Sequence, residues 1–331
     1  MFRYLVRRLL WASVLFIVVT IVTWVIFYAV PVNPARLACG QRATPICIQR
    51  AAHFLGTNKP IYQQYLRYLG RLIPLSFHHG LHYKEPSLGR SFTNRLSVNY
   101  VVGHAAPQTA SLVFGGAIFW LLIALPIGIL SALRPRSLID RASMVGVLVG
   151  ISAHPVWIGL IFAYFFGFKL GLFPISGYSN FFGGGGPDAG PVQWAYHLVL
   201  PWATFAILFA ALYVRMIRAN VMETLNEDYV RTARAKGAPE WLVLRSHVLR
   251  NALLPIVTML GMDIGVALGG AIFTETVYGM HGLGATAVIA INNFDLPTTQ
   301  GVVVFATICI IVFNLGVDLL YAVIDPRIRL T

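Results

Sequence analysis

The sequence has few charged residues and few cysteines. Asp, Glu, Lys and Arg make up 11% of its 331 residues, against roughly 25% in a typical soluble domain. Hydrophobic residues reach 57%, mean hydropathy is +0.71, and there are 3 cysteines. This composition excludes a water-soluble globule, a disordered chain, a coiled coil and a disulfide-rich secreted scaffold. It leaves an all-α, polytopic membrane protein.

Motifs of common catalytic and nucleotide-binding sites are also missing. The chain contains no GxxxxGK[ST], HExxH or GxSxG sequence, so it is predicted neither to hydrolyse ATP nor to act as an enzyme. The four glycines at 183–186 precede no Lys-Ser or Lys-Thr and are interpreted as an outer turn. For His78, His79 and His82, a solvated loop is favoured over a metal site. We expect no cofactor and no metal in this chain.

Apolar stretches with no charge or a single acid predict six membrane-spanning helices, because about 20 apolar residues cross a bilayer. They are residues 9–30, 105–133, 142–168, about 194–214, 253 to about 274, and 296–324. The first stretch is longer than the apolar core of a signal peptide, about 7 to 15 residues, so it is expected to be retained. His154 and Pro155 predict a kink in the third.

The distribution of basic residues predicts the orientation in the membrane. Of 25 Lys and Arg residues, 15 lie at the two termini and in residues 134–141 and 215–250, whereas Lys169 alone lies in a short loop of the opposite side. The positive-inside rule therefore places both termini and residues 215–250 in the cytoplasm, and residues 275–295 outside. The net charge of +13 reflects this topology; without a run of basic residues it does not indicate nucleic acid. The predicted parts are residues 1–30 (N-terminus and first helix), 31–104 (extracytoplasmic loop) and 105–331 (five-helix core with a cytoplasmic coupling loop at 215–252).

The outer loop contains an amphipathic helical pattern. Apolar residues recur there at spacings of three and four, at Ile61, Tyr65, Leu66, Tyr68, Leu69 and Leu72. The pattern fits a lid over the outer rim of the bundle or a docking surface for an external partner. Cys39 and Cys47 lie in this loop, where oxidation is possible, and a disulfide between them is left open. Cys309, in the sixth span, is interpreted as a small core residue.

The inner loop carries the strongest functional pattern. Residues 228–236 predict a short helix with Asp228 at its start and Gly237 in the stop position. Its small residues, Ala233 and Ala235, allow close approach to a partner groove, while Arg231, Arg234 and Lys236 can pair with acids there. A second amphipathic stretch, at Trp241, Leu244, Val248 and Leu249, leads to Pro255 and the fifth span. The alternative is a solvated basic loop with no partner.

At this point the chain resembles the dipeptide and oligopeptide permease B-type subunits of ATP-binding-cassette (ABC) importers. The inner loop NEDYVRTARAKGAPEWLVLRSHVLRNALLP (226–255) is similar to that family's coupling loop. Further matching segments are RYLVRRLL near the N-terminus, GGAIFTETVYGMHGLG (269–284), DLPTTQG (295–301) and NLGVDLLYAVIDPRIR (314–329). Where the general importer motif has Glu-Ala-Ala, this chain has Arg231, Thr232 and Ala233.

The resemblance implies a type I ABC importer permease fold in a bacterial inner membrane. It implies four kinds of partner: a homologous second permease subunit, two cytoplasmic ATPase subunits that bind ATP and Mg, an extracytoplasmic substrate-binding protein, and the lipid bilayer. The residues expected to contact the ATPases are Tyr229, Arg231, Thr232, Ala233, Arg234, Ala235, Lys236 and Gly237.

Two features stand out inside the membrane. Gly261, Gly265 and Gly269 are four residues apart, so they form a narrow stripe where another helix can pack. Asp263 lies about 160° from the stripe and is a candidate for the translocation path. The alternative for Asp263 is a hydrogen bond to a Thr or Tyr inside the bundle. Asp318 is expected to be structural.

Three functions compete at this stage. The leading hypothesis is one half of the pathway of an ATP-driven importer for di- or oligopeptides or related small cargo, such as metal chelates or glutathione. The alternative is an ion-coupled secondary transporter in which Asp263 carries protons. An intramembrane hydrolase is disfavoured because nucleophile and metal motifs are missing.

Overall fold

The computed structural model describes residues 2–29, 35–36, 39, 44–55, 60–72, 75–76, 82–83, 86–182 and 189–324. Within them the regular structure is helical apart from an antiparallel pair of two-residue strands, β1 (Leu75–Ser76) and β2 (His82–Tyr83), and turns and loops connect the helices. The glycine run at 183–186, and His78 and His79, lie outside the described residues. Four helices are long and apolar enough to span a membrane, and two bent helix pairs pass the same test. The six expected spans thus correspond to four unbroken helices and two broken ones.

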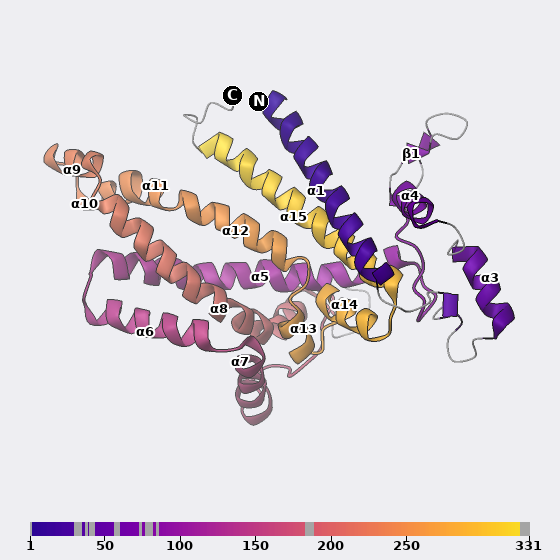
Figure 1. Cartoon of the computed structure of the whole chain (residues 1–331). Coiled ribbons are helices and arrows are strands. Elements are labelled where there is room, and N and C mark those ends of the chain that lie inside the picture. The colour runs from indigo at the N-terminus through magenta and orange to yellow at the C-terminus, as the bar shows by residue number, and fades with distance from the viewer. Residues whose placement is uncertain are drawn as a thin grey trace.

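Two long helices form the centre of the molecule. α5 (Val98–Leu133) packs along α8 (Pro191–Leu225), as Figure 1 shows. The two helices approach closely at Gly128, where an added Cβ would lie only 2.8 Å from Ile217. Trp120 of α5 is fully buried in this contact region, within the main hydrophobic core. The pair provides the scaffold on which the shorter helices rest.

α8 is longer than the sequence predicted. The expected span at 194–214 continues without interruption to Leu225, so residues 215–225, expected in the loop, are helical. The sequence has no Gly or Pro between residues 202 and 236 that would end the helix. Asn226 closes the last turn, because its Nδ2 donates to the carbonyl of Met222 at 2.9 Å.

The third expected span is broken at the predicted kink, and the break is larger than a kink. α6 (Leu138–Ser152) and the following helix, α7 (Pro155–Phe162) with its π-helical continuation η2 (Ala163–Lys169), are bent by 102°. Proline disfavours a helical conformation in the residue before it, and His154 is extended. The span predicted at 142–168 is therefore two helices that meet at the predicted position and not one continuous helix.

The fifth expected span is shorter than predicted. Three short elements lead into it, and a bend of 44° precedes it. α12 ends at Ala267 instead of near Thr274, because the chain turns at Gly270, which has a φ of +135°. The elements of this region are α10 (Glu240–Leu242), η3 (Val243–Leu249), α11 (Arg250–Ala252), α12 (Leu254–Ala267), α13 (Ile272–Val277) and α14 (Leu283–Asn292).

The two terminal helices lie side by side. α1 (Phe2–Ala29) packs against α15 (Leu296–Ile324), which also contacts α12, α14 and α5 (Figure 1). An ion pair between Arg8 and Asp318 joins them, so Asp318 has the structural role expected of it. Cys309 of α15 is half-buried against the main core, as predicted.

The described part of the outer loop rests on the end of α1. It contains α3 (Pro45–Leu55) and α4 (Ile61–Leu72). Tyr68 of α4 is buried and its ring packs on that of Trp24 in a tilted arrangement, with ring centroids 5.2 Å apart. Leu66, expected on the same apolar face, is 61% exposed instead. The possible disulfide between Cys39 and Cys47 is present.

Candidate functional site

The predicted coupling residues lie at one tip of the molecule. α9 (Asp228–Ala235) begins just after α8 ends, and α10, η3 and α11 lead back to the bundle. Figure 1 places α9 and α10 at one end of the long axis, far from α3 and α4 at the other. Helix formation by residues 228–235 agrees with the predicted helix 228–236 to within one residue.

The end of α9 is fixed by a glycine stop. The N–H of Gly237 donates to the carbonyl of Arg234 at 2.9 Å, and the N–H of Ala238 donates to that of Ala233 at 3.2 Å. These are the two bonds of a Schellman motif, which requires a left-handed residue, and Gly237 has a φ of +79°. A Cβ at Gly237 would meet no atom of the described chain within 4 Å. The backbone conformation alone therefore explains the glycine here.

α9 is held to the bundle by both apolar and polar contacts. Val230 is fully buried in the main core, and Ala233 is half-buried against it. Asn251 donates through Nδ2 to the Tyr229 hydroxyl at 2.8 Å, linking α9 to α11. Ala233, predicted to contact a partner, is thus partly covered by the chain's own core.

The remaining seven predicted coupling residues are exposed: Tyr229, Arg231, Thr232, Arg234, Ala235, Lys236 and Gly237. Arg234 binds Glu240 through both carboxylate oxygens, at 2.8 and 3.2 Å. Such an exposed pair contributes only about 0–1 kcal/mol, so it orients the side chain more than it stabilises the fold.

Exposed apolar residues lie next to these charges. Trp241 is 69% exposed and Leu242 47% exposed. Of the predicted amphipathic stretch Val248 is fully buried, as is Val243 beside it, whereas Trp241 is exposed. Trp, Tyr and Arg are the residue types enriched in binding hot spots. The tip of α9 to α10 therefore has the composition of a protein-binding surface.

A buried carboxylate beneath this surface joins three helices. Asp140 of α6 accepts two hydrogen bonds from Arg218 of α8, at 2.6 and 3.0 Å, and others from Ser131 of α5 and the Arg136 N–H. Removing one partner of a buried ion pair costs about 3–5 kcal/mol. The sequence analysis missed this cluster. Ser137 caps α6 by accepting from the Asp140 N–H at 3.2 Å. This Ser-x-x-acid spacing is a helix-start pattern, and it is the one local signal that marks Asp140 in the sequence.

The tip connects mechanically to α12. The chain passes from α9 through η3 and α11 directly into α12, whose first turn contains Pro255. Asn220 of α8 donates to the carbonyl of Ala252 at 3.5 Å, which keeps α11 beside α8. The tip and α12 are therefore joined through α10, η3 and α11, without a long irregular loop between them.

The predicted glycine stripe of α12 lies against α15. Added Cβ atoms would lie 1.9 Å from Val317 at Gly261, 3.1 Å from Phe313 at Gly265, and 3.0 Å from Ala306 at Gly269. At Gly261 this distance excludes a side chain unless Val317 moves, and at Gly265 and Gly269 it is tighter than ordinary contact. Gly261 and Gly265 therefore let α12 pack closely on α15, and Gly269, in the turn after α12, extends the same contact.

Asp263 lies away from that stripe and contacts α8. The Tyr213 hydroxyl donates to Asp263 Oδ2 at 2.7 Å. This is the bond to a Tyr that the sequence analysis held as the alternative. No ion pair of Asp263 occurs among the described residues, and the side chain is only half-buried. The neighbouring α12 residues Met259 and Val266 are exposed, so this face of α12 is uncovered in the single chain.

Two further buried carboxylates, which the sequence analysis missed, organise the opposite end. Glu275 of α13 is fully buried and accepts from the Thr109 hydroxyl at 2.7 Å and from the N–H of Ala285 at 2.8 Å. Asp295 accepts from the Phe92 N–H at 2.9 Å and from Thr298 at 2.8 Å. Only 12 acids occur in the chain, and their rarity was the available signal. Among the described residues, no group of His, Cys, Asp and Glu is suited to hold a metal.

The tip of α9 and α10 exposes basic and apolar residues, and the chain continues from it into α12 of the membrane bundle. This arrangement is that of a transport subunit that another protein drives. Residues 124–330 match the family described as the binding-protein-dependent transport system inner membrane component, and residues 1–113 match the family of its N-terminal region. The chain belongs to this family of inner-membrane permease subunits of ABC importers.

Similar proteins support the same assignment over the full length. The di/tripeptide transport system permease protein of Pseudomonas aeruginosa is 35% identical, with 99% of each chain covered. The dipeptide transport system permease protein of Escherichia coli is 34% identical, also with 99% of each chain covered. The solved MetNI methionine ABC transporter shares the fold, with a TM-score of 0.52 and 18% identity over 68% of this chain and 97% of that chain. The chain is thus a type I permease and not an enzyme; ATP hydrolysis occurs in partner subunits of such importers.

Proposed function

We propose that this chain forms one half of the translocation pathway of an ATP-driven importer for short peptides. The observation that carries the proposal is the exposed tip around α9, which is fixed to the core by Val230 and continues into α12. Movement of an ATPase bound at this tip would tilt α12 and so alternate access to the pathway. The names of the two full-length relatives support peptides as the cargo.

The partners follow from this mechanism. Two ATPase subunits, which bind ATP and Mg, contact the tips of this chain and of a homologous second permease subunit. An extracytoplasmic binding protein delivers the cargo on the side of α3 and α4. The tip lies in the cytoplasm together with both termini, because the short loops on that side carry the excess of basic residues.

Asp263 faces the translocation path in this proposal. Its face of α12 also carries exposed Met259 and Val266, and methionine adapts to varied apolar side chains. The Tyr213 hydroxyl holds one carboxylate oxygen in place. A carboxylate with this support could meet the ammonium group of a passing peptide.

The test is uptake by the reconstituted complex. The vesicles contain this chain, a second permease subunit and two ATPase subunits that face the lumen. We expect them to accumulate a labelled dipeptide only with ATP in the lumen and binding protein outside. The competing ion-coupled function, which the family assignment does not favour, predicts uptake by the single chain under a proton gradient. Gradient-driven uptake without ATPase subunits would overturn the proposal.

A further inference from the structure

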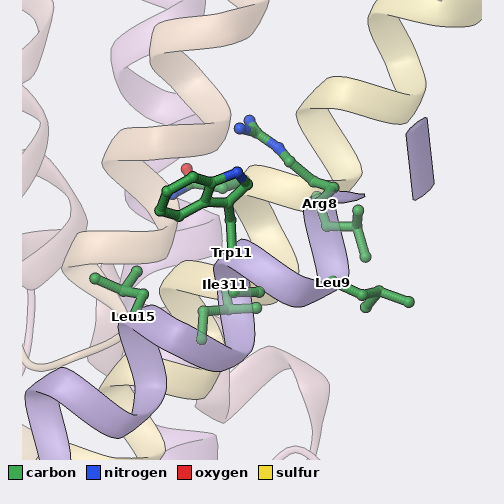
Figure 2. Close-up of a pocket in the computed structure, with 8 residues that line it drawn as sticks. Arg8, Leu9, Trp11, Leu15 and Ile311 are labelled. Carbon is green, nitrogen blue, oxygen red and sulfur yellow. The ribbon is translucent and has the colours of Figure 1, made fainter. Parts of the chain in front are cut away.

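A groove between α1 and α15 changes from charged to apolar along its length. It has a volume of about 140 Å³, and its lining includes Arg8, Trp11, Leu15, Ile311 and Asn314. Figure 2 shows Arg8 and Trp11 on neighbouring turns of α1, with Leu15 and Ile311 further along. Seven residues separate Arg8 from Leu15, a rise of about 10 Å.

The charged end keeps free hydrogen-bond donors. Both recorded contacts of Arg8 with Asp318, through Nε and Nη2, reach the same oxygen, Oδ2. The Arg8 side chain is 46% exposed, whereas that of Asp318 is 16% exposed. The guanidinium has five N–H donors in a planar arrangement that suits phosphate, so donors remain after the ion pair forms.

The position of the groove in the membrane fits a phospholipid. Leu9 begins the charge-free stretch of α1, so Arg8 marks the edge of the hydrocarbon region. Trp11 is 63% exposed, and tryptophan at this depth is typical of the headgroup level. Arg7, which is also exposed, adds positive charge beside the groove. Basic pockets between spanning helices bind anionic headgroups.

We propose that an anionic phospholipid occupies this groove, with its phosphate on Arg8 and an acyl chain along Leu15 and Ile311. The charge of Arg8 and Arg7 against the single acid Asp318 selects an anionic lipid over a zwitterionic one. The lipid would fasten α1 to α15, the contact through which the N-terminal helix joins the bundle. This site is independent of which cargo the importer carries.

The experiment measures lipids retained by the assembled importer. The complex is placed in nanodiscs of equal phosphatidylglycerol and phosphatidylcholine, extracted in mild detergent and weighed by native mass spectrometry. We expect Arg8→Gln to lower retained phosphatidylglycerol by more than the roughly five-fold effect of one basic charge near the surface, because it also removes the N–H donors that hold the phosphate. Arg7→Gln is the matched control, because it removes the same charge from the same helix and leaves the donors of Arg8 in place; it should lower retention less.

Two further variants separate a lipid site from a purely structural ion pair. Asp318→Asn frees Arg8 completely and should raise phosphatidylglycerol retention, whereas Ile311→Trp fills the groove without changing charge and should lower it. Equal effects of Arg7→Gln and Arg8→Gln would overturn the proposal in favour of diffuse attraction. A loss in Asp318→Asn as large as in Arg8→Gln would overturn it in favour of an ion pair that only joins the helices. Unchanged retention in Ile311→Trp would show that the lipid binds elsewhere.

Discussion

At the scale of single residues, glycine is required at different positions for different physical reasons. Gly237 has open space around it and is required for its left-handed backbone, whereas Gly265 has an ordinary helical conformation and is required because Phe313 lies against it. The sequence shows both as glycines near small residues. Their substitutions therefore have different consequences.

For Gly237, the reason is conformational, so the size of the replacement is secondary. We expect Gly237→Val to weaken coupling, because a β-branched residue in the left-handed region costs roughly 1–2 kcal/mol and shifts the end of α9. Gly237→Asn should keep most of the activity, since Asn tolerates that conformation. The measurement is ATPase stimulation by loaded binding protein in vesicles. Equal loss in both variants would show that partner contact, not backbone strain, decides this position.

For α12, we predict that the charge of Asp263 affects transport and that the packing at Gly265 affects assembly. Asp263→Asn keeps an oxygen that can accept from Tyr213 and should change uptake per assembled complex while leaving the yield of complex nearly unchanged. Gly265→Leu should lower the yield several-fold, because its Cβ would already lie 3.1 Å from Phe313 and 3.3 Å from the Cα of Ile310. Both quantities are measured for both variants, with Tyr213→Phe as a control that removes the hydrogen bond and keeps the charge. If Asp263→Asn lowers the yield as much as Gly265→Leu, Asp263 is a packing residue.

At the scale of helices, hydropathy predicted where spans exist but not how they bend. Six apolar stretches were recognised because each contains no charge or a single acid. Pro155 indicated where the third is interrupted, but its angle of 102°, with His154 against Phe273, could not be predicted from the sequence. The end of α12 was missed because residues after Gly270 remain apolar while the chain turns. The two-faced geometry of α9 was missed as well: Ala233 looks like a contact residue by size, and only the packing of Val230 shows which face turns inward.

The turn after α12 depends on a buried carboxylate, which gives a stability prediction. Glu275 accepts from Thr109 of α5 and from two backbone N–H groups, those of Ala271 and Ala285. In Glu275→Gln the amide N–H₂ must face one of these donors, which leaves a buried group unsatisfied at a cost of about 1–3 kcal/mol. We expect a lower melting temperature of the purified complex. Glu223→Gln, at an exposed position of α8, should have no such effect, and equal melting of the two variants would contradict the anchoring role.

At the scale of the whole molecule, function is divided between the two ends. Asp140 and Arg218 fix three helices beneath the tip of α9, while Glu275 and Asp295 fix the opposite end. Between them α12 packs closely against α15 at Gly261 and Gly265. Family membership and the overall fold were predictable from sequence motifs, whereas these anchors were not, because each joins residues that are far apart in the chain.

This division predicts that the single chain is inert toward nucleotide. It has no phosphate-binding loop, and its exposed tip offers arginine and lysine on a short helix instead of a ring of backbone N–H groups around a phosphate. We expect the purified chain to bind no ATP at micromolar concentration in equilibrium dialysis, and to show no hydrolysis above an empty-vesicle control.

Adding the ATPase subunits should restore hydrolysis. Ala235→Glu, which places an acid on the exposed side of α9, should reduce the stimulation of that hydrolysis by loaded binding protein several-fold while the chain still inserts. An Ala235→Ser control keeps the small size and should behave like the unaltered chain. Micromolar ATP binding by the lone chain, or normal stimulation in Ala235→Glu, would remove the tip of α9 from its coupling role.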